Sequence, residues 1–313
     1  MGLAQRIATR GSEFLLFAVT PPRLTASPER AQEIADVTRK RLSSLELDGL
    51  VLYDIDDEND RNPDDRPFPF LPTIDPAAYL AQHLTEWDAP VVVYRAVGKY
   101  QEPELRAWLS AQDAQQLLTV FVGASSHDAQ PATSLARAHE LRAELRPDLM
   151  LGGVAIPERH TRRGDEHRRL IAKQAAGCSF FVTQVVYDLH AAKDLVSDYR
   201  YECQDRGLDP APIVFTFSVC GSMRTLEFLQ WLGVDVPRWI QNDLRHADET
   251  LQASYEQALA TARELIDYCR RMKVPFGLNV ESVSIRRAEI EASVSLAEQL
   301  GRELRRQGPA AAR

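Results

Sequence analysis

Hydrophobic and polar positions along the chain alternate between two patterns. Short apolar runs, rich in Val, Leu, Ile and Phe, are typical of strands buried on both faces. Between them lie stretches with apolar residues every three or four positions, which predict amphipathic helices. The first of these helices is expected to begin with Ser27 as its N-cap and Pro28 at its first turn. The expected strands span residues 14–20, 49–55, 90–97, 117–123, 149–156, 179–187, 212–219 and 276–283.

Eight strands, each followed by a helix, predict an α/β fold of one domain, a single (β/α)8 TIM barrel over residues 1–313. An open, doubly wound sheet is the competing arrangement, but no G-x-G-x-x-G follows the first strand. An acidic, proline-rich loop at about 56–74 interrupts the alternation, and loops of this length are usually functional or disordered. The tail at about 305–313 is expected to fray.

The amino-acid composition argues against several classes of binding partner. The chain is 44% hydrophobic and 26% charged with a net charge of −8, so we expect a soluble globular protein that does not bind nucleic acid. The apolar run at 14–19 is too short to span a membrane. Four cysteines without a C-x-x-C pair argue against a zinc site and favour a reducing cytoplasm. We therefore expect a cytoplasmic protein with no metal, while a homo-oligomer remains open.

In a barrel of this type, chemistry takes place at the C-terminal ends of the strands. Gln184 and Glu281 stand out there because each interrupts an apolar run, and a buried amide or carboxyl without partners is costly. The functional interpretation is therefore favoured for these two residues. The polar candidates at the strand ends are Thr20, Asp54, Asp56, Tyr94, Arg95, Ser125, Ser126, Glu158, His160, Thr183, Gln184, Ser218, Asn279 and Glu281.

Three segments carry a family resemblance. They are FAVTPPR at 17–23, GGVAIPERH at 152–160 and AKQAAGCSFFVTQVVYD at 172–188. With the strand-eight region, they resemble the single-domain bacterial type of the methylenetetrahydrofolate reductase family. The resemblance implies that Gln184 contacts the pterin of a reduced folate. With it we expect Thr183, Thr20 and Asn279 on the substrate side, and His160, Glu158, Lys173 and Tyr94 on the cofactor side.

The chain also departs from the family pattern. Ala18 stands where typical members carry the proton-donating Glu of the first strand, and residues 122–124 replace the flavin-binding Arg-Gly-Asp. We therefore expect FAD to be bound weakly or not at all, as in the family's flavin-independent branch. The resemblance then implies hydride transfer from NAD(P)H to 5,10-methylenetetrahydrofolate, giving 5-methyltetrahydrofolate.

Without the first-strand Glu, the reaction needs another acid within hydrogen-bond reach. We favour Glu281, since burial on a barrel strand can raise the pKa of a carboxyl, with Asp54 as the next candidate. Two alternatives stay open. One is a folate-dependent enzyme that transfers the one-carbon unit without reduction, and the other is a non-catalytic folate-binding or partner subunit.

Overall fold

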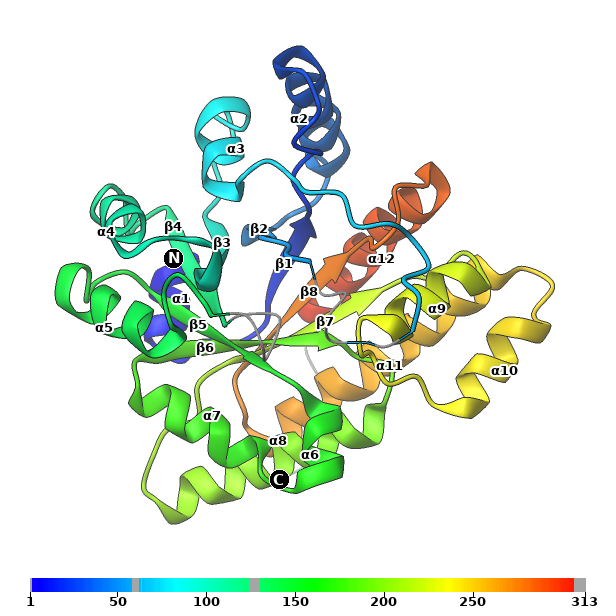
Figure 1. Cartoon of the computed structure of the whole chain (residues 1–313). Helices are drawn as coiled ribbons and strands as arrows, with labels where there is room; N and C mark the ends of the chain where they lie inside the picture. The colour runs from blue at the N-terminus through cyan, green and yellow to red at the C-terminus, as the bar shows by residue number, and fades with distance from the viewer. Residues whose placement is uncertain (1, 58–61, 63, 124–129, 307–313) are drawn as a thin grey trace.

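The computed structural model describes residues 2–57, 62, 64–123 and 130–306. Eight parallel strands close into a barrel in sequence order, and helices surround it (Figure 1). All eight expected strands and the (β/α)8 fold are confirmed. The expected tail lies almost wholly outside the described residues. The strands are β1 Phe14–Val19, β2 Gly49–Leu52, β3 Val91–Ala96, β4 Leu117–Val122, β5 Leu151–Ala155, β6 Cys178–Val185, β7 Ile213–Ser218 and β8 Phe276–Glu281.

Helices follow the strands and bury their apolar faces against the outside of the barrel. The Oγ of Ser27 accepts a hydrogen bond from the Arg30 N–H, so the expected N-cap of the first long helix is confirmed. Within the described residues the helices are α1 Leu3–Ala8, α2 Pro28–Leu42, α3 Pro76–His83, η2 Val97–Lys99, α4 Glu102–Ser110, α5 Leu135–Leu145, α6 Pro157–Arg163, α7 Glu166–Ala175, α8 Leu189–Asp205, α9 Met223–Trp231, α10 Arg238–His246, α11 Thr250–Met272 and α12 Arg287–Arg305. None of the helices among these residues is long and apolar enough to cross a membrane.

The barrel interior is filled by side chains that alternate along each strand. Phe14 and Ala18 of β1 point inward, and Leu3 and Ile7 of α1 join the same apolar cluster. A Cβ at position 277 would lie 2.3 Å from the Phe14 ring, so only glycine fits beside this ring. The interior is thus closed by apolar packing at its N-terminal end, and polar groups are left to the C-terminal end.

The acidic, proline-rich loop crosses the C-terminal end of the barrel as a strap, which we define as residues 64–74 (Figure 1). The Trp231 indole donates to the Asp64 carbonyl at 2.8 Å, and the Phe68 ring packs edge-on against Phe228 of α9. Further along, Thr73 forms an antiparallel bridge with Arg23, just after β1. Because α9 follows β7, the strap links the segments that follow β7 and β1.

Candidate active site

Glu281 is the last residue of β8. In the barrel register it pairs with Ala18 on β1 and with Ser218 on β7. In-register neighbours on parallel strands face the same side of a sheet, so Ala18 lies directly beside Glu281. Burial raises the pKa of the Glu281 carboxyl to about 7, although a hydrogen bond from Tyr53 lowers it somewhat. A carboxyl of this kind holds a proton near neutral pH and can donate it.

A chain of hydrogen bonds leads away from Glu281. The buried Asn279 donates from Nδ2 to the Tyr53 hydroxyl at 3.1 Å and to the Thr216 hydroxyl at 3.3 Å. The Thr216 hydroxyl in turn donates to the Thr183 carbonyl at 2.9 Å. Asn279, predicted as a substrate contact, therefore uses its amide nitrogen to hold Tyr53, which contacts Glu281.

Tyr94 lies beside Tyr53 inside the barrel. Its ring packs edge-on against Tyr53, with 4.9 Å between centroids. Burial, followed by the charge of Glu281, raises the pKa of both tyrosines well above the ordinary value. Both hydroxyls therefore stay neutral donors at physiological pH. The structure places Tyr94, predicted on the cofactor side, close enough to Glu281 to feel its charge.

Gln184 is only partly buried, and its position answers why an amide interrupts an apolar strand. Its Nε2 donates to the Leu232 carbonyl, at the C-terminal end of α9, at 2.8 Å. This bond satisfies one donor and leaves the amide oxygen without a described hydrogen bond to the protein. The residue therefore has a structural contact and a polar group that can still bind a ligand.

The two threonines predicted on the substrate side differ. The Thr183 hydroxyl accepts from the Thr216 N–H at 2.9 Å, where the β6–β7 register shifts, so its oxygen replaces a missing backbone acceptor. Thr20 is exposed just beyond β1. The geometry assigns Thr183 to the barrel wall and leaves Thr20 free to meet a ligand.

Asp54, the second candidate acid, is held in a dense set of contacts. Its carboxylate accepts from the Ala96 N–H at 2.8 Å, the Lys99 ammonium at 2.6 Å and the Tyr100 hydroxyl at 2.7 Å. Together these three donors occupy both carboxylate oxygens of Asp54. The arrangement suits a structural anchor between β2 and the segment after β3, rather than a proton donor.

His160 and Lys173, predicted on the cofactor side, make contacts outside the barrel interior. His160 Nε2 lies 3.1 Å from the Asp198 carboxylate on α8. The Lys173 ammonium donates to the Val154 carbonyl of β5, and burial lowers its pKa. Both side chains therefore have a partner within the protein, and their role on the cofactor side stays a prediction.

Glu158 is buried at the start of α6, and neither carboxylate oxygen has a hydrogen-bond partner among the described residues. Burial raises its pKa to about 7, and the nearby charges of Asp235 and Asp188 add to the effect. A carboxyl with a raised pKa stabilises the fold when protonated, and this contribution is lost as the pH rises from about 4.5 to about 7.

We therefore expect Glu158→Gln to raise the free energy of unfolding by about 1–3 kcal/mol at pH 8, because the neutral amide needs no proton. Below the ordinary carboxyl pKa the two proteins should be equally stable. Denaturant titrations across this pH range measure the difference, with Glu140→Gln on the exposed face of α5 as the control. A constant difference at every pH would show that Glu158 does not titrate in the folded state.

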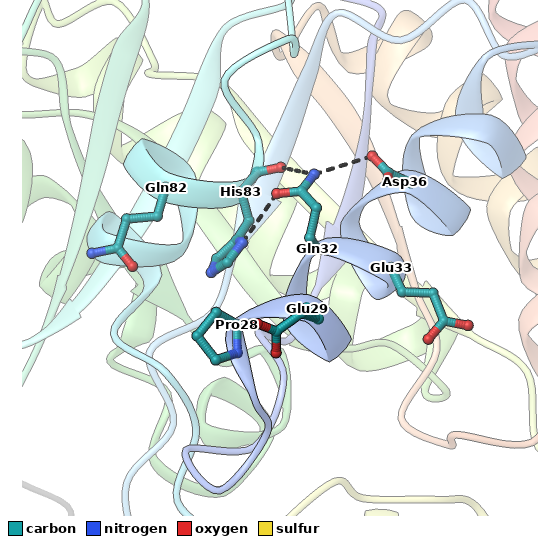
Figure 2. Close-up of a pocket in the computed structure, with 7 residues that line it drawn as sticks. All are labelled: Pro28, Glu29, Gln32, Glu33, Asp36, Gln82 and His83. Atoms are coloured by element: carbon teal, nitrogen blue, oxygen red, sulfur yellow. Dashed lines mark hydrogen bonds between the residues drawn. The ribbon is translucent and has the colours of Figure 1, made fainter.

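A shallow hollow between α2 and α3 is lined by Glu29, Glu33 and Asp36 together with His83 (Figure 2). Gln32 bridges the two helices, since its amide nitrogen donates to the His83 carbonyl at 3.3 Å and its oxygen lies 3.1 Å from the His83 Nδ1. None of the predicted site residues lines this hollow. It belongs to the outer ring of helices and not to the site around Glu281.

Sequence reasoning missed Tyr53 and Thr216. The two-residue alternation from the inward-facing Val51 could have placed Tyr53 inside the barrel. Ser218, expected at a strand end, pairs with Glu281 in the β7–β8 register, and its buried Oγ has no hydrogen-bond partner among the described residues. Ser125 and Ser126, also expected at a strand end, lie outside the described residues. The group around Glu281 thus includes neutral donors that the apolar runs concealed.

Comparisons with known proteins place the chain among relatives. An uncharacterized protein from Clostridium thermocellum, whose structure is described as binding two copies of 5-methyl-5,6,7,8-tetrahydrofolic acid, is 40% identical. The match covers 96% of this chain and 99% of that chain, with a TM-score of 0.84. Dihydropteroate synthase from Xanthomonas albilineans is 14% identical over 91% of this chain and 90% of that chain, with a TM-score of 0.42, which carries no functional argument.

None of the curated proteins searched matches the chain significantly. The family described as methylenetetrahydrofolate reductase has a model that matches residues 122–276, which include strands β5 to β7 and Gln184. Together with the 40% identity over nearly the whole length of a folate-binding structure, this match establishes the family. The chain belongs to the methylenetetrahydrofolate reductase family.

Proposed function

We propose that this protein reduces 5,10-methylenetetrahydrofolate to 5-methyltetrahydrofolate with NAD(P)H, and that Glu281 is the acid. The observation that carries the proposal is the position of Glu281 beside Ala18, with a pKa raised to about 7. The acid that family members carry on the first strand is here supplied by the adjacent last strand. The folate bound to the Clostridium thermocellum relative is the product of this reaction, which supports the choice of substrate.

The proposed reaction needs a proton donor and a hydride donor. Opening the methylene bridge leaves an iminium at N5, and the departing N10 takes a proton, for which the protonated Glu281 is the proposed source. NAD(P)H supplies the hydride that converts the iminium carbon to a methyl group and leaves as NAD(P)+. The rest of the protein's task is to hold donor and acceptor about 3–3.5 Å apart and to exclude water.

Direct transfer without flavin is part of the proposal. His160 and Lys173, the side chains expected to contact a flavin, are bonded to Asp198 and to the Val154 carbonyl. We expect the freshly purified protein to lack flavin absorbance and to oxidise NADH or NADPH when methylenetetrahydrofolate is present. Stoichiometric FAD retained through gel filtration would overturn the flavin-independent part. Tight folate binding without turnover with either nucleotide would favour a non-catalytic folate-binding subunit.

The Gln184 amide is proposed to bind the pterin. Gln184→Ala should weaken binding of 5-methyltetrahydrofolate about 5- to 150-fold, because one unpaired polar group costs roughly 1–3 kcal/mol. Isothermal titration calorimetry measures this affinity directly.

Gln241→Ala is the matched control, since the Gln241 amide also donates to a backbone carbonyl, that of Val236, but from α10. Both variants should lose a similar, small amount of stability, and only Gln184→Ala should lose folate affinity. Equal folate affinity in the two variants would make Gln184 purely structural.

A further inference from the structure

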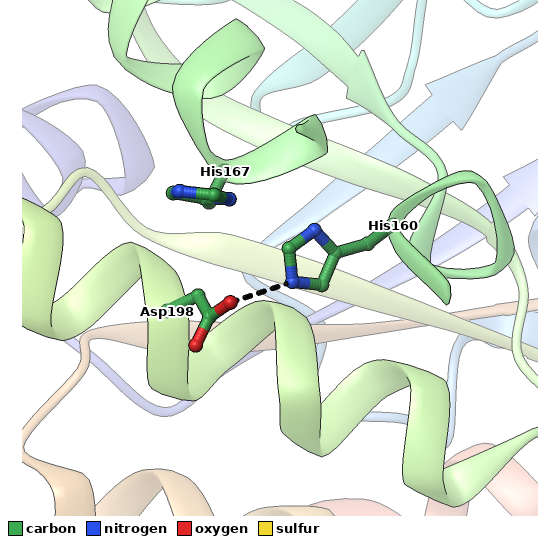
Figure 3. A group of neighbouring side chains, drawn as sticks. All are labelled: His160, His167 and Asp198. Atoms are coloured by element: carbon green, nitrogen blue, oxygen red, sulfur yellow. Dashed lines mark hydrogen bonds and ion pairs between the residues drawn. The ribbon is translucent and has the colours of Figure 1, made fainter. Parts of the chain in front are cut away.

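A second cluster of chemically capable side chains lies outside the barrel, where α6, α7 and α8 meet (Figure 3). His160 comes from α6, His167 from α7 and Asp198 from α8. One ligand atom from each residue lies within 4.8 Å of those of the other two. The two rings meet edge-on with 5.0 Å between their centroids, and His160 Nε2 lies 3.1 Å from the Asp198 carboxylate.

Local structure brings these groups together. Gly164 ends α6 in the left-handed conformation, with φ of 66°, which lets the chain turn sharply into α7. Asp198 and Glu202 lie one turn apart on the same face of α8. Glu202 Oε2 lies 3.7 Å from His167 Nε2, while Arg206 takes the other oxygen, Oε1. Two imidazoles thus face two carboxylates across the junction.

Hydrogen bonds among the described residues satisfy these two buried rings only in part. His160 is 4% exposed and His167 is 5% exposed, yet the Nδ1 atom of each is buried without a partner among the described residues. An imidazole nitrogen that is not protonated is the form that binds metal ions, so two buried rings facing two carboxylates form a suitable ligand set.

We propose that His160, His167 and Asp198 bind a zinc ion, with Glu202 as the fourth ligand. Imidazole and carboxylate ligands in a tetrahedral set are characteristic of Zn²⁺, whereas Mg²⁺ and Ca²⁺ take oxygen ligands. Ligand atoms about 2.0–2.1 Å from a tetrahedral zinc lie roughly 3.3–3.4 Å from one another. The separations of 3.1 Å and 3.7 Å on the two sides of the cluster bracket this value.

The ion would join three helices of the outer ring, and it lies apart from Glu281 and its hydrogen-bonded partners. Its role is therefore structural: it holds α6 and α7 against α8. The expectation of no metal rested on cysteine spacing, which does not test for a site made of histidines and carboxylates. The proposed reduction of folate does not depend on this ion.

The test uses tag-free protein treated with a chelator and titrated with ZnCl2 in a calorimeter. We expect saturable binding of one zinc per chain, a rise in Tm on adding zinc and no saturable binding of MgCl2. Asp198→Asn changes a side chain that is 55% exposed and keeps its shape, so the fold should survive. It should weaken zinc binding at least about tenfold.

His167→Gln should weaken zinc binding as well, and circular dichroism checks that each variant is folded. His246→Gln, an exposed histidine at the end of α10, is the matched control and should bind zinc as the unchanged protein does. The proposal is overturned if the unchanged protein shows no saturable zinc binding. It is equally overturned if folded Asp198→Asn binds zinc with unchanged affinity.

Discussion

Glu281→Gln lowers the turnover of methylenetetrahydrofolate with NAD(P)H about 10²–10⁴-fold, the usual contribution of a positioned acid. The amide keeps the shape of the side chain and removes the proton that N10 must receive. Because burial raises the pKa of Glu281 to about 7, the unchanged protein should lose turnover as the pH rises above 7. Pre-steady-state measurement of NAD(P)H oxidation across pH 5.5–8.5, roughly the range in which such a group titrates, follows both effects.

Ala18 supplies the control for this prediction. A carboxyl introduced by Ala18→Glu lies on the neighbouring strand in register with position 281. In the double variant, Ala18→Glu with Glu281→Gln, part of the lost turnover should return while folate affinity stays close to that of the unchanged protein. Unaltered turnover and an unaltered pH profile in Glu281→Gln would remove Glu281 from the mechanism.

Asp54→Ala lowers the free energy of unfolding by about 3–5 kcal/mol, the cost of leaving a buried charge network without one partner. The substitution leaves the buried Ala96 N–H without its acceptor and removes the carboxylate from the Lys99 ammonium and the Tyr100 hydroxyl. Lys99 and Tyr100 keep one acceptor each, the Ile55 carbonyl and the Asp75 carboxylate. Urea denaturation gives the size of the loss. Turnover per folded molecule, measured at low temperature, should remain.

Asp148→Ala is the matched control, because Asp148 is a carboxylate in a solvent-exposed ion pair. Its ion pair with Arg146 is exposed, with Asp148 57% accessible, and exposed pairs contribute about 0–1 kcal/mol. If Asp54→Ala kept its stability and lost turnover instead, Asp54 would belong to the chemistry.

The barrel was predictable from sequence because its signal is local. A strand buried on both faces must be apolar throughout, so its position is visible in a run of single residues. The strap was visible as an interruption but not as a fixed element. Its order comes from contacts of Asp64 and Phe68 with α9, a helix more than 150 residues further along the chain.

The site was only partly predictable for a related reason. Sequence identifies polar residues at strand ends, but it does not show which polar atoms the protein already uses. Asp54, Thr183 and Lys173 match the expected positions, yet their hydrogen bonds hold strands and helices together. The raised pKa of Glu281 could be anticipated in direction from its apolar strand, whereas its contact with Tyr53 required the closed barrel.

The pairing of Ala18 with Glu281 also bears on how activity arises during folding. These residues lie on the first and last strands, which become neighbours only when β8 docks beside β1 and completes the ring. A partly assembled open sheet can contain every other strand pair and still leave Glu281 without its interior surroundings. The raised pKa of Glu281, the proposed acid, therefore requires ring closure, the strand pairing of largest sequence separation in this barrel and the one with the highest loop-closure cost.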